Sequence, residues 1–157
     1  MTRIDFYVLK SNSSAAKHTF VCRLIDKAVA QGSTLLVATE SAEHSAELDD
    51  KLWSFKPEAY IPHDIIQSDG TLREDTLSDI DQNNSEQLPV RIYHEQDDIH
   101  YHNVLVNLRP SAPKEFSRFE RVIEVVNQES ESLKASRKNY AYYKERGYPI
   151  HTHKLQL

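Results

Sequence analysis

The chain has 157 residues, the length of one ordinary domain, and 39% of them are hydrophobic. No run approaches the ~18 apolar residues that a membrane-spanning helix needs, and a formal net charge of −5 argues against DNA binding by the whole surface. The lone Cys22 cannot form an internal disulfide, and the first segment does not have the pattern of a secretory leader. We therefore expect one cytoplasmic domain (1–157) without a membrane partner.

Charge is distributed unevenly along the chain. Residues 64–89 hold seven acidic residues against the single Arg73, whereas residues 130–157 hold six lysines and arginines against two glutamates. An acidic protein with a basic C-terminal end is typical of a local contact with an anionic partner rather than of a nucleic-acid coat.

The first part of the chain alternates strand and helix patterns. Residues 4–9 are aromatic and β-branched, which predicts a strand, and residues 11–14 offer N-caps for a helix that Gly32 stops. The continuous apolar run 34–39 is typical of a strand covered on both faces. Strand, helix and strand in this order predict parallel pairing with a right-handed crossover.

A second helix is predicted from about Ser41, and Trp53 falls more than about 100° off its apolar stripe. The stripe consists of Ser45, Leu48, Leu52 and Phe55. After Pro57, residues 60–63 have the pattern of a short edge strand, because Pro62 cannot donate to a central ladder.

The remaining segments predict a long surface loop, further strands and a last helix. The polar, acidic loop covers about 69–88. The elements that follow are strands at 90–93 and 104–108, a short helix around 116–119, a strand at 122–126 and a helix at about 129–146 that Gly147 and Pro149 stop. We predict an open, mostly parallel α/β sheet flanked by helices, with nucleotide-binding-like topology.

The motifs of nucleotide binding and nucleophilic catalysis are missing from the sequence. The first strand-to-helix turn, 10–14, has no glycine, so backbone amides cannot closely approach a pyrophosphate there. No Gly-x-Ser-x-Gly elbow occurs, and Cys22 falls in the middle of a predicted helix. We therefore predict no cofactor and no catalytic residue.

Two histidine pairs offer an alternative. His100 with His102, and His151 with His153, would each place two imidazoles on one side of an extended chain, and acids at 97–98 could add ligands. A small metal-dependent hydrolase is therefore an alternative function. Because a bare His-x-His is a weak motif, the main hypothesis assigns no metal.

The last predicted helix has a basic and aromatic face. Four residues spaced 4, 3 and 4 apart share it: Leu133, Arg137, Tyr140 and Lys144. Such a face suits a peptide's terminal carboxylate beside a bulky apolar side chain. Two alternatives remain at this point: a solvated basic helix with Tyr140 packed into the core, and a direct nucleic-acid-binding α/β domain.

Several segments carry a family resemblance by their order and spacing. They are Phe6–Leu9, Leu48–Phe55 leading to Tyr60–Asp64, Val106–Leu108, Glu124–Val126, and Ser136–Tyr140 with Tyr143 and Gly147. Over nearly its whole length the chain resembles the chi subunit of the bacterial DNA polymerase III holoenzyme, an accessory protein of the clamp-loader complex. None of these segments is a catalytic signature.

The resemblance implies a non-catalytic replication adaptor at the bacterial replication fork. Such a protein binds the acidic, Phe-ending C-terminal tail of single-stranded DNA-binding protein and reaches the clamp loader through the psi subunit, so that it meets DNA only indirectly. The tail residues carried over are Arg137, Tyr140 and Val126, with Lys134 and Gly147 as neighbours. The chain departs from the family at Ala141, where a basic residue commonly follows the tyrosine.

A second surface is expected to bind psi. Trp53 lies off the core stripe of its helix, and Phe55, Ile61 and Pro62 lie near it in sequence. Together these residues are a candidate exposed apolar anchor. The alternative is that Trp53 covers a neighbouring strand.

Overall fold

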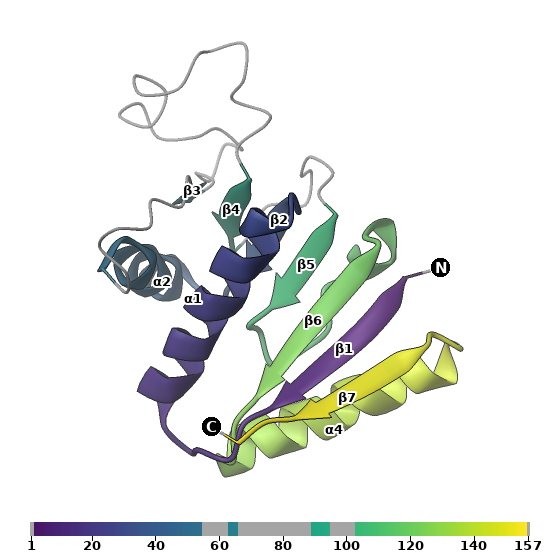
Figure 1. Cartoon of the computed structure of the whole chain (residues 1–157). Helices are drawn as coiled ribbons and strands as arrows, with labels where there is room; N and C mark the ends of the chain where they lie inside the picture. The colour runs from purple at the N-terminus through teal and green to yellow at the C-terminus, as the bar shows by residue number, and fades with distance from the viewer. Residues whose placement is uncertain (1, 55–62, 66–88, 95–102, 157) are drawn as a thin grey trace.

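A computed structural model of the chain describes residues 2–54, 63–65, 89–94 and 103–156 (Figure 1). Its strands are β1 (Arg3–Val8), β2 (Leu35–Ala38), β3 (His63–Ile65), β4 (Val90–Tyr93), β5 (Val104–Asn107), β6 (Arg121–Val126) and β7 (Ile150–Lys154). Its helices are α1 (Ser14–Ala30), α2 (Ala42–Ser54) and α4 (Ser130–Glu145), with a 3₁₀ turn η2 (Phe116–Arg118).

The strands form one sheet in the order β3-β4-β2-β5-β6-β1-β7, and every neighbouring pair is parallel. The predicted open, parallel α/β fold is therefore confirmed. The first strand lies near one end of the sheet, between β6 and β7, with Val8 of β1 beside Val126 of β6.

Helices cover both faces of the sheet, and each face has its own apolar core (Figure 1). On one face, α1 and α2 pack against β-strand residues such as Val37 and Ile123. On the other face, α4 and η2 pack through Tyr143 and Phe116 against residues that include Val122. The alternation of side chains along each strand supplies both cores at once.

Local signals set the ends of the helices largely as predicted. The Ser13 hydroxyl accepts from the amide of Ala16 and caps α1. Gly32 and Gly147 both have positive φ, 85° and 79°, at the turns that follow α1 and α4. Such a backbone favours glycine, which explains why these helices stop there.

The predicted mid-helix Cys22 is buried, and burial raises the pKa of its thiol to about 11.

One strand differs from the prediction, and another is described only in part. β7 was not predicted, because its sequence is polar; as an edge strand it is held by backbone pairing to β1 and needs no apolar run. Of the short edge strand expected at 60–63, residues 60–62 lie outside the described residues, and His63 begins the edge strand β3. The expected loop at 69–88 lies outside the described residues.

Candidate functional site

The face of α4 with Leu133, Arg137, Tyr140 and Lys144, called the outer face below, exposes the last three residues, while Leu133 is half-buried against the core. Tyr140 is the one large hydrophobic residue exposed among the described residues, at 40%. Its ring packs on Phe6 of β1 with 5.6 Å between centroids, and Lys144 Nζ lies 5.9 Å from the ring centroid. Arg137 is exposed and forms no hydrogen bond or ion pair within the described part of the chain. A cation and an aromatic ring therefore face solvent together.

The other residues predicted to hold the tail occupy different places. Val126 ends β6 and is buried in the core cluster against which Leu133 packs, so it supports the outer face from below. Lys134 is exposed and lies 3.8 Å from Glu131, one turn before it. Gly147 lies beyond the C-terminal end of α4, two turns from Tyr140, where its positive φ turns the chain toward β7.

A buried carboxyl group holds the inner side of α4. Glu124 Oε1 accepts hydrogen bonds from the Tyr143 hydroxyl and from Asn107 Nδ2, both at 2.8 Å. Asn139, one turn before Tyr143, donates through Nδ2 to the carbonyl of Pro110 at 3.2 Å. These contacts fix the rotation of α4 and thereby leave its outer face toward solvent.

Glu124 is an acid in an apolar strand. Val122 and Val126 lie on the same side of β6 and belong to the core beneath α4. Burial raises the pKa of Glu124 to about 7, although the hydrogen bonds from Asn107 and Tyr143 favour the charged form. Sequence reasoning assigned 122–126 to a buried strand and missed this role, yet one glutamate inside four apolar residues was the available signal.

A second buried carboxyl group lies on the opposite face of the sheet. In Asp5 of β1, Oδ2 accepts a hydrogen bond from Arg121 Nε at 2.6 Å, and Oδ1 accepts one from Arg3 Nη2 at 3.1 Å. His153 Nε2 of β7 lies 2.9 Å from the same Oδ1. Burial alone would raise the pKa of Asp5, but the hydrogen bonds from His153 and Arg121 and the charge of Arg121 outweigh it and lower that pKa.

One histidine of the C-terminal pair, His153, belongs to this cluster. His153 contacts Asp5 and stacks on Tyr7 at 4.6 Å between centroids, whereas His151 is exposed. His100 and His102 lie outside the described residues. Among residues 2–54, 63–65, 89–94 and 103–156, no group of three or more His, Cys, Asp or Glu side chains is arranged to hold a metal ion.

The residues predicted for the psi surface are only partly described. Trp53 lies in the last turn of α2, where the structure describes only the backbone. Phe55, Ile61 and Pro62 fall outside the described residues. This surface stays a prediction.

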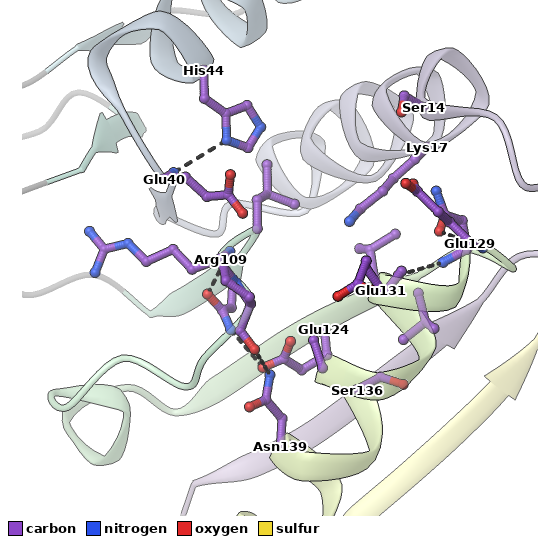
Figure 2. A pocket seen from close by; sticks show the side chains of 18 of the residues that line it. Ser14, Lys17, Glu40, His44, Arg109, Glu124, Glu129, Glu131, Ser136 and Asn139 are labelled. Carbon is purple, nitrogen blue, oxygen red and sulfur yellow. Dashed lines mark hydrogen bonds between the residues drawn. The ribbon is translucent and has the colours of Figure 1, made fainter.

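A cavity of about 350 Å³ opens at the carboxyl ends of β2, β5 and β6 (Figure 2). Its walls come from the first turns of α1, α2 and α4 and from the segment after β5. Lys17, Glu40, His44, Glu124 and Asn139 are among its lining residues. Sequence reasoning missed this cavity, because its walls come from segments far apart in the chain.

The fold defines the chain as an open, all-parallel α/β domain flanked by helices. It superposes on the C-terminal domain of the DEAD-box protein Dbp5 with a TM-score of 0.62, 15% identity, and coverage of 96% of this chain and 90% of that one. It also resembles T4 UvsW, with a TM-score of 0.66, 7% identity, and coverage of 99% and 42%. At these identities the likeness concerns the fold alone. Among the described helices, none is long and apolar enough to cross a membrane.

The chain belongs to the DNA polymerase III chi subunit (HolC) family, whose model matches residues 1–151. It is 33% identical over 155 residues to DNA polymerase III subunit chi of Pseudomonas aeruginosa, covering 99% of this chain and 98% of that protein. Identity to DNA polymerase III subunit chi of Escherichia coli K12 is 22% over 157 residues, covering 97% of each. Family membership gives the chain an accessory role in DNA replication.

Proposed function

We propose that this chain is a non-catalytic adaptor in the bacterial cytoplasm that connects the C-terminal tail of single-stranded DNA-binding protein to the clamp loader through the psi subunit. The observation that carries the proposal is the exposed Tyr140, seated on Phe6 beside an Arg137 that has no partner among the described residues. Family membership supports the same role.

The chemistry of the outer face suits an acidic peptide that ends in phenylalanine. Arg137 would hold the terminal carboxylate through charge-assisted hydrogen bonds, and the Tyr140 ring with Leu133 would cover the terminal aromatic side chain. Lys144 matters here because Ala141 leaves no charge directly after Tyr140. One turn further along α4, Lys144 brings an ammonium group over the same ring. It would attract the acidic residues of the tail.

The alternatives predicted from the sequence receive less support. His153 is engaged with Asp5 and Tyr7, which leaves only the exposed His151 of that pair for a ligand. The exposed side of α4 offers a single aromatic ring rather than the series of rings that stack on single-stranded nucleic acid.

The tail site is tested by Arg137→Ala. Because hydrogen bonds to a charged group contribute about 1.5–3 kcal/mol, affinity for an acidic peptide ending in Phe should fall roughly 10- to 100-fold by calorimetric titration. Arg23→Ala, at an exposed arginine of α1, is the matched control and should bind as the wild type does. Amidating the peptide should weaken wild-type binding and change little further in Arg137→Ala. Equal affinity of Arg137→Ala and wild type would refute the site.

The psi surface is tested through Trp53, the only tryptophan. If psi covers its side chain, its fluorescence should shift to the blue on complex formation once the partner's own signal is subtracted. An unchanged spectrum would exclude Trp53 from the interface and leave the tail site unaffected.

A further inference from the structure

The cavity at the carboxyl ends of the strands lies where a ligand site is expected in this fold. In open parallel sheets, ligands bind outside these ends, where the connections of two adjacent strands leave toward opposite faces. Here β2 continues into α2 on one face, while the neighbouring β5 continues into η2 on the other. The cavity opens at this point, and its volume of about 350 Å³ suits a small molecule.

Several ionisable groups that line the cavity have displaced pKa values. Burial lowers the pKa of Lys17, although the charges of Glu124 and Glu40 oppose the change. Burial also lowers the pKa of His18 and His44 and raises that of Glu124 to about 7. Such groups gathered in one cavity mark a candidate functional site.

The charges are graded with depth. Glu124 is buried, Lys17 is half-buried, and Glu40, Glu129 and Glu131 are exposed at the rim. Figure 2 shows Lys17 reaching from α1 into the cavity, toward the side chains of the other walls. Within the described part of the chain, its ammonium group makes no hydrogen bond and no ion pair shorter than 4 Å.

The other cation of the lining, Arg109, directs its guanidinium away from Lys17 and Glu124 (Figure 2), and its Nη2 has no hydrogen-bond partner among the described residues. The Nε of Arg109 donates to the carbonyl of Thr39 at 2.8 Å, and its guanidinium lies 4.7 Å from the centroid of the Tyr93 ring. Lys17 is therefore the positive group that a ligand would meet.

From this arrangement we propose that the cavity binds a small dipolar ligand that carries one carboxylate and one ammonium group, the class of free α-amino acids. The carboxylate of the ligand pairs with Lys17 and with the first-turn backbone amides of α4. These amides accept a ligand because the side chain of the N-cap residue Glu129 forms no capping hydrogen bond. The ammonium group pairs with the rim carboxylates of Glu40 and of Glu131, whose Oε1 also lies 3.8 Å from Lys134 Nζ.

Ligands with one sign of charge fit this cavity less well. A simple anion, and still more the phosphates of a nucleotide, would be repelled by three carboxylates at the rim. A simple cation would be attracted at the rim but repelled by Lys17. A dipolar molecule places each of its charges beside its opposite.

This site is separate from the outer face of α4. The helix lines the cavity with Glu131, Ser132, Ala135, Ser136 and Asn139, whereas Arg137 and Tyr140 point about 100° or more away from the middle of that set. The two sites adjoin at Val126, which lines the cavity, and at the Glu131–Lys134 ion pair. Lys17 and Arg137 each belong to one site alone, so Lys17→Met and Arg137→Ala test the two sites separately.

The test is an NMR titration of the ¹⁵N-labelled full chain with each of the twenty L-α-amino acids, and with acetate and methylammonium as half-ligands. We expect at least one amino acid to shift the amide signals around Lys17 and Glu124 saturably, with an affinity at least about tenfold higher than either half-ligand. Lys17→Met should weaken that binding about tenfold or more, because it removes a charge-assisted contact. Lys27→Met, at an exposed lysine in the last turn of the same helix, should not change it.

Glu131→Gln gives a second, independent readout at an exposed position. It should weaken binding of the amino acid and strengthen that of acetate, because it removes a repulsive rim charge. The proposal is overturned if no amino acid shifts these signals saturably below about 10 mM. It is also overturned if a half-ligand binds as tightly as the amino acid, or if Lys17→Met binds like the wild type.

Discussion

Asp5 and Glu124 are two buried carboxyl groups on adjacent strands of one sheet, and their pKa values are shifted in opposite directions. Both side chains are closed to solvent: Asp5 is fully buried and Glu124 is 4% exposed. Asp5 meets the cations Arg3 and Arg121 and the imidazole of His153, whereas Glu124 meets the neutral donors of Asn107 and Tyr143. The pKa of Asp5 is lowered and that of Glu124 is raised. Burial raises the pKa of Glu124, whereas the cationic partners of Asp5 outweigh its burial and lower its pKa.

The two groups also make opposite contributions to stability as pH changes. A lowered pKa stabilises the folded state above the unfolded pKa, and this stability is lost as pH falls through the folded value. A raised pKa has the reverse sign. The folded state holds a proton on Glu124 that the unfolded chain releases between its ordinary pKa of 4.5 and about 7, so stability from this group falls across that window as pH rises.

Asp5→Asn should have the largest effect. It removes the negative charge from a site that keeps Arg121 and Arg3, and breaking such a pair costs about 3–5 kcal/mol, toward the lower end here because Arg121 is partly exposed. Urea unfolding near neutral pH would measure it. Asp50→Asn, at an exposed position of α2, should stay within about 0.5 kcal/mol of wild type. A loss no greater for Asp5→Asn than for Asp50→Asn would contradict the importance of the cationic partners.

Glu124→Gln should act in the opposite direction. The amide oxygen can still accept from Asn107 and Tyr143 but carries no charge, so the variant should be more stable than wild type by as much as about 3 kcal/mol at about pH 8. The gain should shrink as pH falls and vanish below about pH 4.5, where Glu124 is protonated in both the folded and the unfolded state. Glu145→Gln, at an exposed residue of α4, should show no such pH dependence. If the free energies of unfolding of Glu124→Gln and wild type differed by the same amount at every pH, Glu124 would not titrate near neutrality.

Tyr143→Phe should have the smallest effect of the three. It deletes one donor to Glu124 while keeping the buried ring, at a cost of about 1 kcal/mol. It should also raise the pKa of Glu124 further, because this hydrogen bond favours the charged form. Carboxyl ¹³C titration would follow that change, and Tyr142→Phe, whose ring also packs in this region, is the control. An unchanged titration of Glu124 would show that its partners contribute little beyond burial.

Much of the framework follows from local sequence. Hydrophobic spacing predicted α1, α2, α4 and the central strands, glycines marked the ends of α1 and α4, and helical spacing gathered Arg137 and Tyr140 on one face. The partnerships could not be predicted, because they join residues distant in the chain. Arg121 lies 116 residues from Asp5, and His153 lies 148 residues from it. Residue spacing carries no information about such contacts, and the cavity was missed for the same reason.

In an all-parallel sheet, the amino ends of all strands lie at one edge and the carboxyl ends at the other. This difference decides which terminus should be used to immobilise the protein on a solid support. β1 begins at the amino edge, while β7 finishes at the carboxyl edge, so the two ends of the described chain lie on opposite sides of the molecule (Figure 1). The cavity and the first turn of α4 share the carboxyl edge with the end of β7. A tether on the N-terminal side keeps that edge open to solution, whereas one placed after β7 crowds it.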